Sequence, residues 1–119
     1  MPIEVKYCCP NDHLDWDEFE KNPPQDLLNA YGWFYVTIGE VGSDAGNDFQ
    51  VCVATPRAVG RLKASGMLPG ILVDSFDTTS IRQAIDAKVC SAGEGNWRQA
   101  LDRLRTFMHW EYEGMDGID

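Results

Sequence analysis

The sequence predicts an α+β fold with a single, mainly antiparallel sheet of about four strands and about three helices packed on one face. Strand-like runs with β-branched and aromatic residues occupy the first half of the chain, and capped helical patterns gather in the second half. With 119 residues, of which 44% are hydrophobic and 24% charged, the chain is long enough to bury one core. We therefore expect residues 1–119 to form one domain.

Three stretches read as strands. In Ile3–Cys9 apolar and polar residues alternate until Pro10 ends the pattern, and a β-hairpin joins Trp33–Gly39 to Phe49–Ala54. One face of the second hairpin arm is wholly apolar and predicts the core: it carries Phe49, Val51 and Val53. A further strand is expected over Ile71–Phe76. Residues 11–30 look irregular and are expected to form a long surface loop with one helical turn at Asp26–Ala30.

The helices are marked by their caps. Thr55 and Pro56 predict the start of a short helix over residues 56–65, and Asp77 predicts the start of a second one that ends near Gly93. Asn96 and Gln99 have the spacing of a capping box for the last helix. Its apolar positions, at spacings of four, three and four residues, are Trp97, Leu101, Leu104 and Met108.

Excess acid is concentrated in two blocks without lysine or arginine, within a net charge of −9. The first block comprises Asp12, Asp15, Asp17, Glu18 and Glu20, and the second Glu111, Glu113, Asp116 and Asp119. Such a field attracts a cationic partner and repels nucleic acid and anionic membranes. The plainer alternative, an acidic face that only aids solubility, weighs about equally at this point. No apolar run reaches the ~20 residues of a membrane span, and the amino terminus lacks a secretory signal, which favours the cytoplasm.

Few residues could carry catalysis. His13 or His109 could pair with the Cys8 or Cys9 thiol, but no local signature marks an activated thiol, and the second pair of ligands that a zinc site needs is missing. No nucleotide-binding or nucleophile-elbow motif occurs. The four cysteines are expected to be free thiols, with Cys52 and Cys90 buried as small apolar side chains. We therefore predict no enzyme activity, catalytic residue, metal site or cofactor.

Several short segments, in their order and spacing, resemble the immunity protein 8 family. They are the hairpin arm ending Val51–Pro56, the strand Ile71–Asp77, the helix start Gly95–Trp97 and the terminal Trp110–Glu113. The resemblance spans roughly residues 33–113. It implies a small bacterial protein, encoded beside a polymorphic or contact-dependent toxin, that binds and blocks the cognate toxin in the cytoplasm of the producing cell.

The mechanism that would follow is occlusion by an acidic surface. Toxins of such systems are often nucleases with cationic grooves. Exposed ion pairs contribute roughly 0–1 kcal/mol each, so apolar anchors must supply much of the binding free energy of a tight complex. The predicted toxin-binding residues are Asp12, Asp15, Trp16, Asp17, Glu18, Phe19, Glu20, Glu111, Glu113 and Asp116. For Trp16 and Phe19 the alternative, that both rings fold back onto the protein, stays open. The competing function is an acidic adaptor module without a toxin partner.

Overall fold

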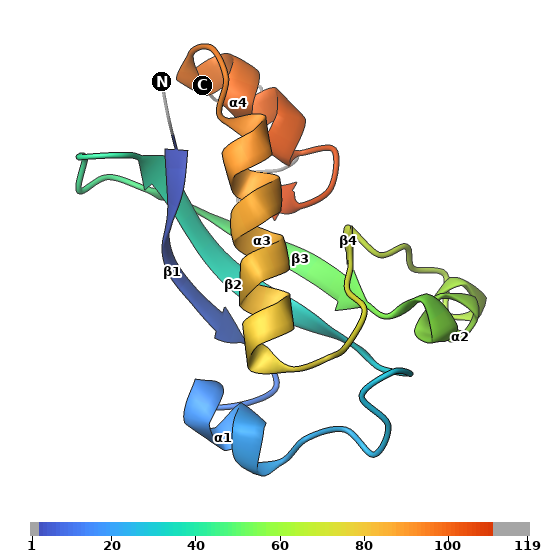
Figure 1. Cartoon of the computed structure of the whole chain (residues 1–119). Coiled ribbons are helices and arrows are strands. Elements are labelled where there is room, and N and C mark those ends of the chain that lie inside the picture. Colours follow the sequence, from blue (N-terminus) through green and yellow to red (C-terminus); the bar gives the residue numbers. More distant parts are fainter. Residues whose placement is uncertain (1–2, 111–119) are drawn as a thin grey trace.

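The computed structural model describes residues 3–110, which form a five-stranded sheet with four α-helices (Figure 1). In chain order the elements are β1 (Ile3–Pro10), α1 (Trp16–Lys21), β2 (Tyr31–Glu40), β3 (Asn47–Ala54), the 3-10 turn η1 (Pro56–Ala58), α2 (Val59–Ala64), β4 (Ile71–Leu72), α3 (Thr78–Ala92), α4 (Trp97–Leu104) and β5 (His109–Trp110). The predicted α+β class and mainly antiparallel sheet are confirmed.

The strand order is β1-β2-β3-β4, and β5 also pairs with β3. β1, β2 and β3 are antiparallel neighbours, whereas β4 runs parallel to the end of β3 and β5 antiparallel to its start. The predicted strand Ile71–Phe76 is wrong in its length, because only Ile71–Leu72 pair. Val73 still donates to the Ala54 carbonyl, but β3 ends there and offers no further partner.

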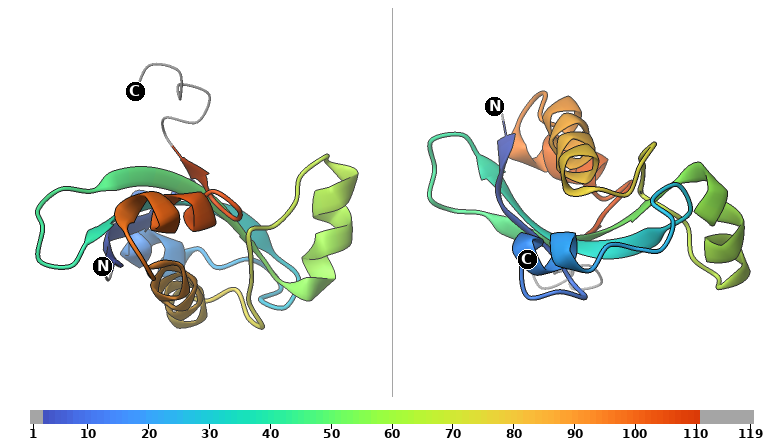
Figure 2. Two further views of the ribbon diagram at one scale, coloured as in Figure 1. Left: turned by 90° about the horizontal axis from the view of Figure 1, so that it is seen from above. Right: turned by 60° about the horizontal axis from the view of Figure 1, so that its bottom comes forward.

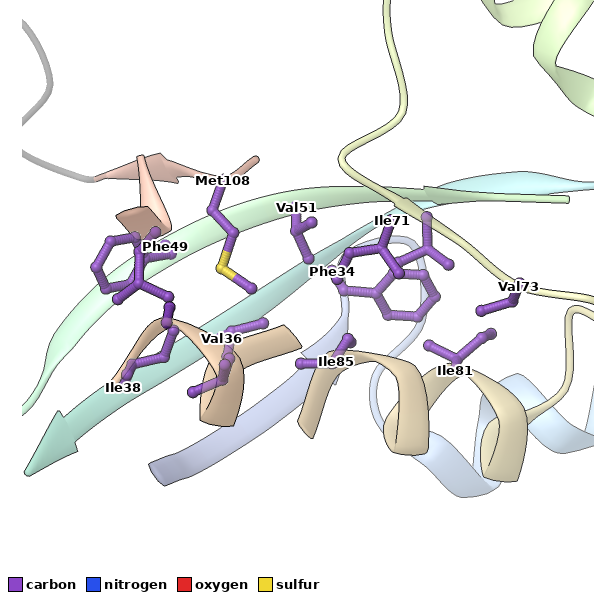
Figure 3. Packing of buried hydrophobic residues seen from close by; sticks show 14 of the residues in the cluster. Phe34, Val36, Ile38, Phe49, Val51, Ile71, Val73, Ile81, Ile85 and Met108 are labelled. Carbon is purple, nitrogen blue, oxygen red and sulfur yellow. The ribbon is translucent and has the colours of Figure 1, made fainter. Parts of the chain in front are cut away.

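The core lies on the face of the sheet that α3 and α4 cover, which we call the first face. Figure 2 shows these two helices together on one side of the curved sheet, and Figure 3 shows Ile81 and Ile85 of α3 facing the core side chains of β2 and β3. The buried sheet residues of the first face are Phe34, Val36, Ile38, Phe49, Val51 and Val53. They alternate along both strands, as the sequence pattern predicts for a sheet with one covered face.

Two helices keep their predicted caps, whereas Thr55, before η1, makes no side-chain cap hydrogen bond because its hydroxyl bonds with the Ala30 backbone. Asp77 accepts a hydrogen bond from the Ser80 amide, and Asn96 and Gln99 form a complete capping box. α3 ends at Gly93 as predicted. The last helix is shorter than expected and ends at Leu104, yet Met108 remains in the core because its amide bonds to the Leu104 carbonyl and turns the chain back.

Residues 11–30 differ most from the expected loop. They contain α1, whose N-cap is Asp15 and whose Phe19 is buried. The helical turn predicted at Asp26–Ala30 is present as one hydrogen-bonded turn, in which the Asn29 amide donates to the Asp26 carbonyl and the Leu28 amide to the Asp26 carboxylate. The loop prediction was wrong because the stretch has few apolar residues, although Asp15 and Glu18 have the spacing of a helix start.

α2 packs on the opposite side of the sheet, which we call the second face. There a small separate cluster joins Leu62 to Cys52 and Ala54, with Tyr31, Trp33 and Met67 around it. The prediction that Cys52 is buried is confirmed, whereas Cys90 is exposed. Cys90 follows the buried Val89, and one step along a helix rotates a side chain by about 100°, which turns the thiol toward solvent.

β1 stands at one end of the strand order. Its pairing with β2 shifts register between Val5 and Tyr7, as in a β-bulge. Beyond the bulge, the Trp16 indole N–H donates to the Cys8 carbonyl at 2.8 Å. α1 therefore occupies part of the edge that β1 would otherwise present.

Candidate functional site

The acidic segment, residues 12–20, comprises the turn before α1 and most of α1 itself, and it lies at the end of the molecule away from α4 (Figure 1). Asp12, Asp15, Asp17 and Glu20 are exposed, and Glu18 is half-buried. Among residues 3–110, no lysine or arginine nitrogen lies within 4.0 Å of these carboxylates, and the basic side chain within that distance is His13, whose Nδ1 is 3.5 Å from Glu18 Oε1. The negative charge of this segment is therefore left for solvent or a partner.

Trp16 and Phe19 fold back onto the core. Phe19 is only 5% exposed, and its ring lies edge-on to Phe34 and tilted against Phe76, with centroids 6.1 and 5.8 Å apart. Trp16 stacks on Phe34 at 5.6 Å and fixes its indole N–H on Cys8. These two rings hold α1 in place, so a partner approaching the acidic segment meets its carboxylates and not the Phe19 ring.

Leu14 is the apolar side chain that sequence reasoning missed in this segment. It is 86% exposed, directly before the N-cap Asp15. Its side chain is an exposed apolar group among the carboxylates of the acidic segment. The sequence did contain a signal for its exposure. Trp16 and Phe19, which face inward, are three residues apart and so share one face of a helix, and Leu14 does not fit that spacing.

The second acidic block lies outside the described residues, so Glu111, Glu113 and Asp116 stay predictions. The last described residues, His109 and Trp110, face opposite sides of the sheet. Trp110 packs against the core, opposite Phe49, and the His109 ring lies 5.4 Å from Trp33 on the second face.

The described residues contain no group of three or more His, Cys, Asp or Glu side chains placed to hold a metal ion. Burial raises the pKa of the Cys8 thiol to about 12, which leaves it protonated and unreactive near neutral pH. His13 lines a small hollow of about 160 Å³, but its 3.5 Å separation from Glu18 exceeds the length of a hydrogen bond between a base and its orienting acid. These arrangements lack the geometry of nucleophilic or metal-assisted chemistry.

What the structure describes here is an exposed acidic surface on an α+β scaffold, of the kind that a small protein acting by contact with another protein presents. The chain belongs to the immunity protein 8 family, whose family model matches residues 9–115. Comparison with curated proteins and with solved structures finds no match. Proteins of this family are non-catalytic and neutralise a cognate toxin, in agreement with the prediction that the chain is not an enzyme.

None of the helices formed by residues 3–110 is long and apolar enough to cross a membrane.

Proposed function

We propose that this immunity protein neutralises a nuclease toxin in the cytoplasm of the producing cell by placing its acidic segment over the cationic groove of the toxin. The observation that carries the proposal is the exposure of Asp12, Asp17 and Glu20 on an element fixed to the core, without lysine or arginine partners among residues 3–110. A groove that binds a nucleic-acid backbone is lined with cations, so a rigid acidic surface competes directly with the substrate.

The charge of the acidic segment is expected to raise the rate of association with the toxin more than the affinity of the complex. Complementary fields raise association rates by about 10- to 10³-fold at low salt, whereas each exposed ion pair contributes roughly 0–1 kcal/mol. A nanomolar complex needs about −12 kcal/mol. The acidic segment therefore needs apolar contacts beside it, and Leu14 is the one that it offers itself.

The partner is the toxin domain encoded beside this chain. A neighbouring reading frame for a large secreted protein with a carboxy-terminal toxin domain supports the proposal, and its absence favours an adaptor role. Co-purification of the two proteins is the direct measurement.

Charge reversal tests the acidic segment. The triple variant Asp12→Lys, Asp17→Lys and Glu20→Lys leaves the N-cap Asp15 in place, so α1 keeps its first hydrogen bond. We expect association with the toxin domain, measured by stopped flow at low salt, to slow at least tenfold, and protection of toxin-expressing cells to weaken.

A matched control separates local from overall charge. Asp44→Lys, Glu94→Lys and Asp102→Lys also change three exposed acids, but these residues lie in the β2–β3 hairpin, the α3–α4 loop and α4. Each triple raises the formal net charge from −9 to −3, because every substitution adds two charges. Equal slowing by both triples, or by neither, would contradict a docking role for the acidic segment.

A further inference from the structure

We infer that the second face of the sheet is the apolar half of the toxin interface, with Tyr7, Trp33 and His109 as its contact residues. The inference rests on the proposed function, because the toxin is the partner that it places there. The toxin surface that fits this face presents lysine or arginine side chains toward the acidic segment, on the β1 side, and an uncharged side chain on the side of β3 and β5.

Register defines the second face. Cys8 pairs with Val36 and Pro10 with Phe34 on the first face, so the alternate residues of the same strands point the other way. Besides Tyr31, Cys52 and Ala54 near α2 and Leu72 beside Ala54, the second face carries Tyr7, Cys9, Trp33, Tyr35, Thr37, Asp48, Gln50 and His109. Tyr7 and Tyr35 meet edge to face at 6.1 Å, and Trp33 and His109 at 5.4 Å.

These side chains are neither core nor ordinary surface. Trp33 is half-buried, His109 is exposed, and Tyr7 is 56% exposed in the centre of a strand. Tyrosine and tryptophan are enriched at protein interfaces, where a few such rings supply most of the binding energy. Of the described helices, α2 packs on this face, and it does so only at the end around Cys52 and Ala54.

A hollow of about 480 Å³ lies at that end of the second face. Trp33, Cys52 and His109 contribute to its sheet side, and Leu68, which is 70% exposed, stands in its wall with the 105–108 turn. Clefts that hold ligand groups have volumes of about 300–1,000 Å³. Because Arg105 also lines the hollow, we expect it to accept an uncharged side chain rather than a cation.

At the same end of the sheet, but on the β1 side of Trp33, the second face continues into the acidic segment. Asn11 follows β1, its amide donates to the Trp33 carbonyl, and its side-chain amide donates to Gln50 Oε1 at 2.5 Å across the sheet. Asp12 is the next residue. A toxin bound to the acidic segment is therefore brought against Trp33 first and, further back along β1, against Tyr7, whose ring favours the charged ends and aliphatic stems of lysine and arginine.

The second face and the acidic segment together have about the area that a protein–protein interface uses. Three strands of about eight residues, at about 3.4 Å per residue and 4.8 Å between strands, cover roughly 400 Å². A standard interface uses ~800 Å² on each partner. The acidic segment alone is too small for that, and the two surfaces together approach it.

The test compares two double variants that remove similar exposed side chains. Tyr7→Ala with His109→Ala strips the second face, and Val41→Ala with Leu28→Ala removes side chains that are 52% and 47% exposed in the β2–β3 hairpin and in the loop before β2. We expect the first pair to raise the Kd for the toxin domain at least tenfold, without changing its salt dependence, and the control pair to change it less than twofold. Thermal unfolding of each variant verifies that it folds.

Hydrogen exchange gives a second measurement that needs no substitution. In the complex with the toxin domain, amides of β1 and of residues 67–70 should gain protection, while those of the solvent side of α3 should not. Unchanged exchange at β1, or equal Kd values for the two double variants, overturns the inference.

The two proposals fail in different ways. If the acidic triple weakens binding and the Tyr7/His109 pair does not, the second face is excluded and the proposed function stands. If the unaltered protein does not bind the toxin domain, the proposed function fails, and the inference fails with it.

Discussion

The two faces of the sheet are built from alternate residues of the same strands, yet they have different tasks. On β2, Phe34, Val36 and Ile38 are almost completely buried under α1, α3 and α4, while Trp33 and Thr37 on the second face remain partly exposed. The first face uses plain hydrocarbon that can be close-packed, and the second uses rings that also carry polar groups. A sheet of this kind can supply its stability from one side and recognise a partner with the other.

The largest expected effect is on the first face. Phe34 is 1% exposed and contacts the rings of Trp16, Phe19 and Phe76, so Phe34→Ala should lower the free energy of unfolding by about 3–5 kcal/mol. Chemical denaturation measures this directly. Tyr7→Ala removes a ring from the second face and should cost under about 1 kcal/mol. Similar losses for the two variants would show that the faces do not divide stability and recognition as argued.

A smaller effect is expected at the cap of α3, the helix that covers the first face. The Ser80 amide donates to Asp77 and lowers the pKa of that carboxyl. A carboxyl with a lowered pKa in the folded protein stabilises it above the unfolded-state value of about 3.9, and this stabilisation disappears as the pH falls through the folded-state value.

Asp77→Ala should therefore lower the free energy of unfolding by about 1 kcal/mol at pH 7. Asp77→Asn keeps the accepting oxygen but cannot ionise, so it should remove the contribution of this residue to acid destabilisation below pH 4. Urea titrations at pH 7 and pH 3.5 test both variants. If the free energy of unfolding of Asp77→Asn falls between pH 7 and pH 3.5 as much as that of the unaltered protein, the acid destabilisation comes from other carboxyl groups.

The smallest effect concerns two neighbouring thiols and changes no stability. Cys8 points to the first face and Cys9 to the second, and burial raises the pKa of Cys8 to about 12. Since the thiolate is the reactive form, a maleimide at pH 7.5 should modify Cys9 at least about tenfold faster than Cys8. Mass spectrometry of single-cysteine variants gives both rates. Faster labelling of Cys8 would contradict the assignment of the two faces.

Much of this fold could be predicted because it depends on local chemistry. Alternation identified the inward residues of β3, and the cap residues Asp77 and Asn96 placed the starts of two helices. The length of β4 could not be predicted, because it depends on where the neighbouring strand ends. β5 was missed for the same reason: a two-residue strand has no periodicity and exists only through its pairing with β3.

The candidate site was harder to predict than the fold. The acidic segment was recognised from its composition, but its helix was not, because two inward rings are too few to produce a periodic signal. Which of Trp16, Phe19 and Leu14 faces outward depends on contacts with Phe34 and Phe76, which lie far away in the sequence. The second face escaped notice because its residues come from five strands, and register alone brings them together.

The hydrogen bond from the Trp16 indole to the Cys8 carbonyl has a consequence for self-association. An eight-residue strand at the margin of a sheet is a template on which another chain can add its own strand, the first step toward amyloid-like stacking. The Trp16 indole occupies one of the β1 carbonyl groups that an added strand would need as a hydrogen-bond acceptor. The bulge between Val5 and Tyr7 bends the rest of β1, so that it does not match a straight strand. The α1 helix, which carries the acidic side chains, thus also protects the edge of the sheet from aggregation. Substitutions that detach α1 are expected to cause aggregation before they cause unfolding.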